Sequence, residues 1–254
     1  METLFNKILE NIQADHACVM ATVVSSVGSS PRKVGAKMLV FSNGDIDGTI
    51  GGGGLESLVI RDAIEAFRRK KSFLKEYPLD EKSGLQVCGG KVKIFLDVIL
   101  PDKKLIICGG GHIGLALSFL GKLLGFKVIL IDNRRAFASS RRFAHVDKIV
   151  CGPYEKSLKR IPCDKKTHIV IVTHGHAFDR ECLTAALKAK AGYIGMIGSK
   201  TKIKLVFQDL KKKGFKQSQL EGVYTPIGLS IGAQTPEEIS VAIAAQLIQH
   251  SKAA

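Results

Sequence analysis

Glycines at the start of a predicted helix give this sequence its clearest chemical signal. Gly109, Gly111 and Gly114 form the pattern G-x-G-x-x-G directly after a short apolar run. The first glycine allows a tight turn, the second lets a phosphate approach the backbone, and the third lets the helix pack on a sheet. His112 lies inside the turn and can hydrogen-bond a phosphate, and Asp132 follows near the spacing of a ribose-binding carboxylate. The spacing is therefore typical of the turn in a dinucleotide-binding β-α-β unit.

The segments around this turn must form a β-α-β unit to position it. Residues 105–108 and, apart from Lys127, residues 127–131 are apolar, as in buried strands, and residues 113–124 carry apolar side chains at helical spacing. Strands at 146–150, 167–173 and 193–197 and helices near 180–190, 200–213 and 236–250 continue the alternation. This order predicts an α/β chain whose C-terminal part is a Rossmann-like, doubly wound parallel sheet. It leaves open whether the sheet holds a nucleotide, because a fold does not fix a function.

A second run of glycines leads into another predicted helix. Free N–H groups at a helix start attract anions, so the candidate ligand contacts here are Gly51, Gly52 and Gly53. An upstream loop offers hydroxyl donors and a positive charge through Ser29, Ser30 and Arg32. The alternative is a plain tight connection between a strand and a helix. Glu56 is interpreted as a favourable charge in the first helical turn rather than as a catalytic base.

Cys88 is the candidate for sulfur or metal chemistry. It precedes Gly89 and Gly90, which let the backbone come close to a ligand. A thiolate there could contact a soft metal or its sulfur, provided that neighbouring cations lower the pKa of the thiol. The alternative is an inert cysteine buried in a turn. Of the other cysteines, Cys108 and Cys151 end apolar runs and are predicted to be small core residues.

Two further polar groups follow predicted strands. His174, His176 and Asp179 have the spacing of weak metal-ligand candidates. A ligand-facing loop at the carboxyl end of a strand is favoured over a metal, and Asp179 could instead cap a helix. No metal site is therefore predicted. At the start of a later helix, Ser199 and Lys200 could contact a phosphate from the far side.

The first part of the chain predicts a smaller α/β domain. A helix at 4–13 and strands at 17–25, 37–41, 45–50 and 91–100 surround a helix over 55–67. Asn43-Gly44 predicts a tight hairpin between two of these strands. The short polar segment Pro101-Asp102-Lys103-Lys104 precedes the β-α-β unit, so the predicted domains are residues 1–102 and 103–254.

Composition limits the classes of function. Of the 254 residues, 45% are hydrophobic, which is enough for a proper core, and no run of 18 apolar residues could cross a membrane. The chain start shows no signal-peptide pattern, so a cytoplasmic protein with no membrane partner is expected. The net charge is +15, but the lysines are scattered and no nucleic-acid-binding motif accompanies them. Nucleic acid is therefore not an expected partner.

Motifs along nearly the whole chain resemble the xanthine dehydrogenase accessory factor family, XdhC/CoxI. The resemblance rests on the shared order of short segments, which are Gly28 to Arg32, Gly48 to Gly53 with Leu55-Glu56, Cys88 to Gly90, Gly109 to Gly114, Thr173-His174 with His176 and Asp179, Tyr193 to Gly195 with Gly198 to Lys200, and Pro226 to Leu229 with Ile231 to Ala233 and Thr235 to Glu238. Two positions depart from the family pattern. Val87 stands where a second cysteine is common, and Ser230 where many members carry an aspartate.

The resemblance implies a role in the maturation of molybdenum hydroxylases. Members are understood to hold the molybdenum cofactor, a phosphorylated pyranopterin dithiolene, while its terminal sulfur is installed, and then to deliver it. The implied partners are a xanthine dehydrogenase-like hydroxylase and a cysteine desulfurase. The resemblance and the apolar C-terminal helix also predict a homodimer. The alternative function is an NAD(P)-dependent oxidoreductase that uses the glycine turn and Asp132, although no Tyr-x-x-x-Lys pair follows that turn.

Overall fold

The chain folds into two units. A computed structural model describes residues 2–28, 32–79 and 90–253. Contacts between Cα atoms divide the chain into residues 1–102 and residues 103–254. Each unit contains its own five-stranded sheet and its own buried core.

The first unit is an antiparallel sheet with a helix on each face. Its helices are α1 (Glu2–Gln13) and α2 (Gly53–Arg69). Its strands are β1 (Cys18–Val27), β2 (Lys37–Phe41), β3 (Ile46–Gly48), β4 (Phe73–Leu79) and β5 (Gly90–Ile99). The strand order is β3-β2-β1-β5-β4, and every neighbouring pair is antiparallel. The hairpin between β2 and β3 turns at Gly44, whose φ of 89° suits glycine.

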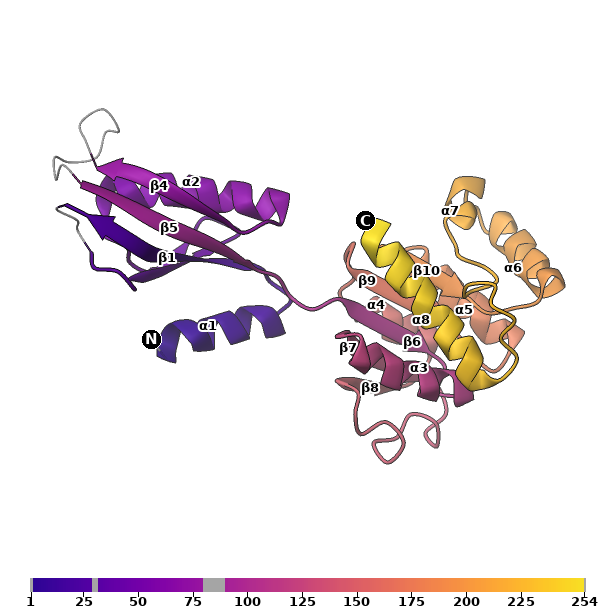
Figure 1. Cartoon of the computed structure of the whole chain (residues 1–254). Helices are drawn as coiled ribbons and strands as arrows, with labels where there is room; N and C mark the ends of the chain where they lie inside the picture. The colour runs from indigo at the N-terminus through magenta and orange to yellow at the C-terminus, as the bar shows by residue number, and fades with distance from the viewer. Residues whose placement is uncertain (1, 29–31, 80–89, 254) are drawn as a thin grey trace. The chain divides into compact units, whose positions relative to one another are not determined.

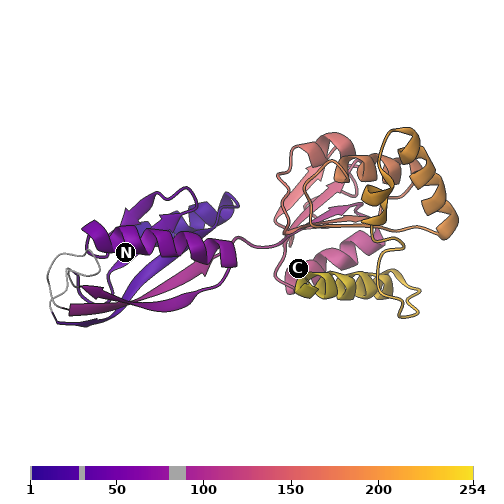
Figure 2. The same cartoon turned by 90° about the horizontal axis from the view of Figure 1, so that it is seen from above.

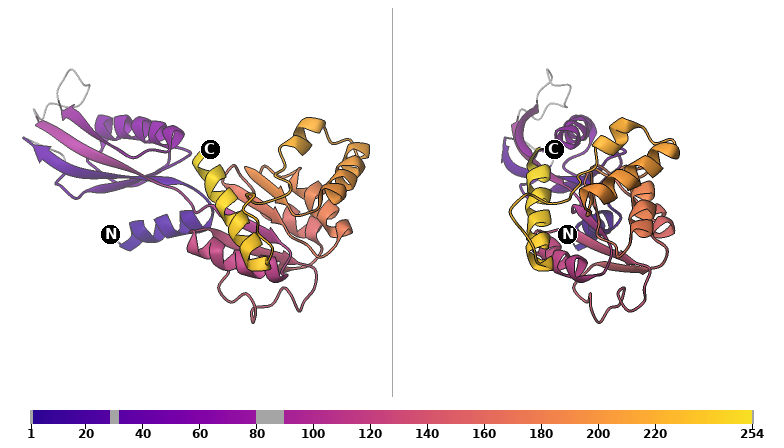
Figure 3. Two further views of the ribbon diagram at one scale, coloured as in Figure 1. Left: turned by 45° about the vertical axis from the view of Figure 1, so that its right-hand side comes forward. Right: turned by 90° about the vertical axis from the view of Figure 1, so that its right-hand side faces the viewer.

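Alternation along the strands decides which helix covers which face. Val19, Ala21 and Val23 of β1 point into the core under α2, while Cys18 packs with Ile8 of α1 on the opposite face. Figure 1 and the left view of Figure 3 show α1 and α2 on the two sides of this sheet. The face under α2 is buried along β1, β2 and β5, whereas the opposite face is buried by α1 near Cys18 and Leu39 and stays exposed at Lys91, Lys93 and Phe95 of β5.

The second unit is a parallel sheet between two layers of helices. Its strands are β6 (Lys104–Cys108), β7 (Lys127–Asp132), β8 (Lys148–Cys151), β9 (Thr167–Ile171) and β10 (Tyr193–Met196). Its helices are α3 (His112–Leu123), α4 (Tyr154–Lys159), α5 (His176–Ala186), α6 (Lys200–Lys212), α7 (Gln217–Glu221) and α8 (Pro236–Ala253). The strand order is β10-β9-β6-β7-β8, and every pair is parallel. The predicted Rossmann-like doubly wound sheet is confirmed.

Successive residues of each strand serve different cores. Leu105 and Ile107 of β6 pack with Leu117 of α3 and Leu247 of α8, while Ile106 faces the other layer. Figure 2 shows α3 and α8 together on one side of this sheet, with the helices drawn in orange on the other. This two-sided burial holds the strand ends rigidly, so the loops that follow them are well positioned.

Several elements differ from the sequence prediction. The helix expected near residue 180 already begins at His176, and the strand expected from residue 146 begins at Lys148. Neither β4 nor the short helices α4 and α7 were predicted. No helix in the described residues is long and apolar enough to cross a membrane.

Candidate functional site

The candidate site lies at the carboxyl edge of the parallel sheet. From β6 the chain continues to β7 and β8 on one side, and it then returns to β9 and β10 on the other. Ligands of such sheets bind outside the carboxyl ends of the strands at this reversal. The loops after β6 and β9 meet there, since the Val172 N–H donates to the Cys108 carbonyl at 2.9 Å. The candidates Gly109 to Gly114 and His174 are therefore brought to one edge.

The three glycines of the turn have different reasons to be glycine. A Cβ on Gly109, whose φ is +118°, would lie 2.3 Å from the Val172 carbonyl oxygen. A Cβ on Gly114 would lie 1.9 Å from the carbonyl oxygen of Gly109. A Cβ on Gly111 would meet nothing within 4 Å, and its φ of −67° is accessible to any residue. The fold requires the first and third glycines, whereas the second borders open space.

The start of α3 offers hydrogen-bond donors to that space. Gly111 is the N-cap residue and no side chain caps the helix. Its carbonyl accepts from Leu115, but among the described residues no acceptor is found for the N–H groups of His112 and Ile113. The His112 side chain is exposed. Such a helix start binds anions through its N–H groups and its positive dipole end.

Asp132 faces inward rather than toward a ligand. The carboxylate is fully buried and accepts from the Gly110 N–H at 2.7 Å. It also accepts from the Arg134 guanidinium at 3.0 and 2.9 Å. Burial alone would raise the pKa of Asp132, but these hydrogen bonds outweigh burial and hold the pKa below its usual value. In this structure Asp132 braces the turn, and its carboxylate is not presented to a ribose.

Two arginines complete the surroundings of the turn. Arg142 donates to the Gly110 carbonyl at 3.2 Å, and the Arg134 guanidinium lies 3.7 Å from the centre of the Phe137 ring. The Nε atom of Arg142 is buried and has no hydrogen-bond partner within the described ranges. Sequence spacing did not single out either arginine. The signal that could have found them is the cluster of arginines directly after Asp132.

The weak metal candidates have other partners. Asp179 is buried in the first turn of α5, where it accepts from the Thr173 hydroxyl at 2.6 Å and pairs with Lys202. Gly175 is the N-cap of α5, so Asp179 is not the capping residue. The His174 ring packs 4.7 Å from the Phe178 ring. The side chain of His176 lies outside the described parts, and the remaining residues contain no metal-binding cluster of three ligands.

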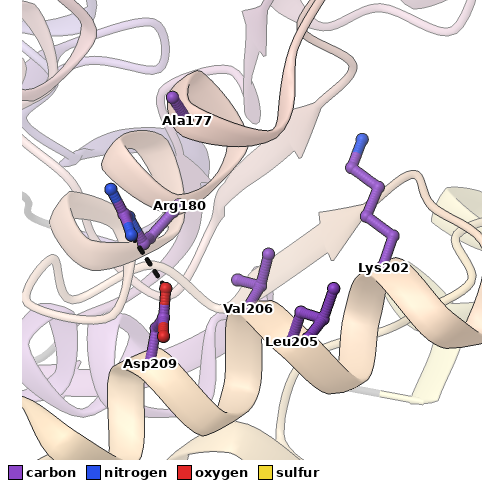
Figure 4. Close-up of a pocket in the computed structure, with 6 residues that line it drawn as sticks. All are labelled: Ala177, Arg180, Lys202, Leu205, Val206 and Asp209. Atoms are coloured by element: carbon purple, nitrogen blue, oxygen red, sulfur yellow. Dashed lines mark hydrogen bonds and ion pairs between the residues drawn. The ribbon is translucent and has the colours of Figure 1, made fainter.

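Ser199 and Lys200 follow β10 at the same edge. Ser199 caps α6 by accepting from the Lys202 N–H at 3.3 Å, and Lys200 is exposed. A shallow pocket of about 290 Å³ lies between α5 and α6, close to this cap (Figure 4), and is lined by Ala177, Arg180, Lys202, Leu205, Val206 and Asp209. Arg180 and Asp209 pair across it at 2.8 Å, so its charges are largely balanced.

The glycine-rich connection that leads into α2 is partly occupied by the chain itself. One carboxylate oxygen of Glu56 accepts from the Thr49 hydroxyl at 2.6 Å and from the N–H groups of Gly52 at 2.9 Å and Ile50 at 3.1 Å. Burial opposes ionisation of Glu56, yet these hydrogen bonds outweigh it and lower the pKa. Glu56 is therefore the helix-start charge that the sequence predicts, and it occupies two N–H groups just before the helix, those of Ile50 and Gly52.

The described candidates of the first unit lie toward one end of its sheet. The end of β1, the end of β3 and the start of β5 lie together, as the pairs Val27 with Lys91 and Thr22 with Lys37 show. This end carries Gly90, the connection that contains Arg32, and the glycines that lead into α2. The side chains of Ser29, Ser30 and Cys88, together with Gly89, lie outside the described residues.

The other cysteines differ sharply in exposure. Cys18, Cys108 and Cys182 are buried, and burial raises the pKa of Cys18 and Cys182. Cys151 is exposed at the end of β8, so the prediction that it is a core residue is wrong. The reason is that β8 is an edge strand, and sequence alone does not distinguish an edge strand from a central one.

Comparison with known proteins agrees with this architecture. The XdhC Rossmann domain family matches residues 105–247, and the XdhC and CoxI family matches residues 12–78. Because the first match alone covers more than half of the sequence, the chain belongs to the XdhC family.

Three relatives and one solved structure show the range of similarity. YqeB of Escherichia coli is 29% identical over 91% of this chain, and a probable subunit of a Bacillus subtilis xanthine dehydrogenase is 30% identical over 63%. This chain spans 43% and 46% of their lengths. The molybdenum cofactor insertion chaperone PaoD of E. coli is 20% identical, covering 96% of this chain and 87% of PaoD. The crystal structure of a xanthine dehydrogenase from Bacillus halodurans shares the fold, with a TM-score of 0.55 and 23% identity over 97% of this chain and 95% of that one.

Proposed function

We propose that this protein is an accessory factor that binds the molybdenum cofactor, supports its sulfuration and delivers it to a xanthine dehydrogenase-like hydroxylase. Family membership and the similarity to a molybdenum cofactor insertion chaperone support this role. The observation that carries the proposal is the pairing of an open backbone at Gly111 with an inward-facing carboxylate at Asp132. Such a turn can bind a phosphate. The carboxylate that would usually bind a ribose, that of Asp132, is already bonded to Arg134.

The described residues suit the phosphate end of this cargo. The N–H groups of His112 and Ile113 would donate to phosphate oxygens, and the α3 dipole would favour their charge. Arg142 would add a fixed positive charge, because its guanidinium is anchored on the Gly110 carbonyl and retains a buried donor without a partner in the described ranges. The site thus offers hydrogen bonds and charge for binding, and it would hold the cargo without transforming it.

The sulfur end of the cargo requires a different ligand. Soft metals and their sulfur atoms prefer thiolates, and Cys88 remains the candidate on this ground. The buried thiols of Cys18, Cys108 and Cys182 are poorly suited, since they are closed to a large ligand. In this proposal a cysteine desulfurase supplies the sulfur. The protein would act as a homodimer, for which Val241 and Ile248 of α8 provide exposed apolar contacts.

The same geometry disfavours the alternative function. An NAD(P)-dependent oxidoreductase of this fold binds the ribose through the acidic residue at the end of its second strand. Here that residue is buried under Arg134, so the role of cofactor carrier is the better match.

A cofactor-retention experiment tests this proposal. The protein would be incubated without oxygen with molybdenum cofactor released from a molybdenum hydroxylase, then desalted and assayed for bound molybdenum and pterin fluorescence. We expect wild type to retain both, Gly111→Val to lose at least tenfold, and Gly222→Val to behave as wild type. Gly222 is a matched control because its φ is −74° and an added Cβ meets nothing closer than 3.6 Å. Failure of wild type to retain pterin, together with tight NAD binding, would overturn the proposal.

A further inference from the structure

One edge of the parallel sheet remains open along a short strand. β8 pairs only with β7 among the described strands, so its other side has no strand partner. The Gly152 N–H donates to the Asp132 carbonyl at 3.1 Å, toward β7. Because backbone groups alternate along a strand, the N–H and C=O groups of Ile149 and Cys151 point away from β7. These groups are the hydrogen-bonding positions that an added strand would use.

A groove runs beside this edge. Its volume is about 450 Å³, and it lies between β8 and the helix α4 that follows it. The residues that line it are Lys148, Ile149, Val150, Cys151, Gly152, Pro153, Lys156, Ser157, Arg160 and Ile161. The strand itself supplies one wall, and α4 with the residue after it supplies the other. The groove thus follows the backbone that would accept a partner strand.

The charges along the groove have one sign. Lys148, Lys156 and Arg160 are exposed, and none of them forms an ion pair with any residue in the described parts. The two carboxylates that adjoin Lys148 and Lys156 in sequence are already paired, Asp147 with Lys122 at 2.8 Å and Glu155 with Lys159 at 2.7 Å. A lysine on an edge strand is a common safeguard against aggregation. That safeguard does not require two further cations on a neighbouring helix or a groove between them.

We propose that the β8 edge binds an extended, acidic segment of a partner protein, which adds a strand to the parallel sheet. The backbone of the segment would hydrogen-bond to Ile149 and Cys151, and its acidic side chains would face Lys148, Lys156 and Arg160. A second copy of this chain does not fit, because pairing two β8 edges would bring two sets of these cations together. A nucleic acid would match the charge but not the row of strand hydrogen bonds. This proposal does not depend on cofactor binding.

A peptide-binding experiment first tests whether the groove cations contribute to binding an acidic strand. The probe is a fluorescein-labelled nine-residue peptide in which glutamate alternates with valine, titrated by anisotropy at low salt. We expect wild type to bind it and Lys156→Glu/Arg160→Glu to bind at least tenfold more weakly. The control Lys211→Glu/Lys212→Glu makes the same change in charge at exposed positions of α6, and it should bind within twofold of wild type.

A second probe separates strand addition from simple charge attraction. N-methylation of alternate peptide amides removes strand donors but leaves the charge unchanged, so it should weaken binding at least tenfold. In amide NMR spectra of the wild-type chain, the largest shifts should occur at Ile149 and Cys151. Three results would each overturn the proposal: no binding by wild type, equal binding of the methylated peptide, or tighter binding of a single-stranded oligonucleotide at these same amides.

Discussion

Two glycine-rich helix starts in this chain look alike in sequence and differ in structure. The run before α2 and the turn before α3 each bring backbone N–H groups to the start of a helix, and each lies near an acidic residue. At α2, Glu56 turns its carboxylate onto the N–H groups of Ile50 and Gly52, immediately before the helix, and occupies them. At α3, Asp132 instead accepts from the Gly110 N–H on the sheet side of the turn. The N–H groups of the first helical turn therefore stay open. The position of one carboxylate therefore decides whether the N–H groups beside a glycine turn are occupied by the chain or available to an external anion.

The difference has a simple physical origin. Glu56 belongs to the first turn of its own helix, so its side chain can reach back over the helix start. Asp132 ends the neighbouring strand β7 and reaches the turn from the sheet side, where Arg134 holds it. A carboxylate on the helix competes with an external anion for the backbone N–H groups. A carboxylate on the sheet side of the turn only stabilises the loop.

The largest effect is expected from a glycine that the fold itself requires. Gly114→Ala places a methyl group 1.9 Å from the Gly109 carbonyl, and backbone cannot yield as a side chain can. We expect the free energy of unfolding of the second unit to fall by about 3 kcal/mol or more. Hydrogen exchange of the β6 amides would measure it. Gly111→Ala is the matched control and should lower this value by only about 1 kcal/mol, because alanine is a poorer N-cap than glycine but meets no clash here. Equal effects of both changes would contradict the distinction drawn between the two glycines.

Acid should weaken the second unit before it affects the start of α2. Burial lowers the pKa of His168 to about 4, below the value near 6.5 of an unfolded histidine. The unfolded chain therefore takes up a proton first, and stability falls as the pH drops from 6.5 to 4, by about 3 kcal/mol in all. Hydrogen exchange of β9 amides across this range would measure the loss. His168→Phe should flatten the slope, and an unchanged slope would assign the effect to other groups.

Local patterns predicted much of the fold because they act over short distances. Asn43-Gly44 specified a hairpin, and the β-α-β unit around Gly109 could be predicted from its periodicity. Strand β4 was missed because its burial depends on long-range pairing. Lys75 and Glu76 are exposed, and only Tyr77 and Leu79 of this strand are fully buried once β5 lies alongside. No local pattern indicates that pairing.

The candidate site shows the same limit. Spacing correctly placed the glycines and His174 at one sheet edge, and it also identified Asp132 as a special position. It could not predict that Arg134 would bind Asp132, or that Lys202 would bind Asp179 from a helix further along the chain. Side-chain direction and ion-pair choice depend on the assembled sheet, so residue type and spacing alone left these roles open.

A smaller effect is expected from removing the carboxylate that closes the α2 start. Glu56→Ala leaves the Ile50 and Gly52 N–H groups and the Thr49 hydroxyl without their acceptor, which should cost the first unit about 2 kcal/mol at pH 7. The pKa of Glu56 is lowered, so its contribution is complete above the unfolded value near 4.3 and is lost as the pH falls through the folded value. Hydrogen exchange of α2 amides at pH 7 and pH 3 should show a smaller difference between variant and wild type at pH 3 than at pH 7. An equal difference at both pH values would mean that packing, not charge, is responsible.

The smallest effect tests the comparison most directly, because it asks whether each helix start can take an external anion. Inorganic phosphate, added against chloride at matched ionic strength, should shift the amide resonances of His112 and Ile113 and leave those of Ile50 and Gly52 unchanged. Binding of a single phosphate at one turn is weak, so millimolar concentrations are needed. In Glu56→Ala the donors before α2 become free, and their resonances should then respond as well, since the internal anion that excluded phosphate is gone. A response at Gly52 in the wild type would show that Glu56 does not close this turn, and the two helix starts would then be equivalent.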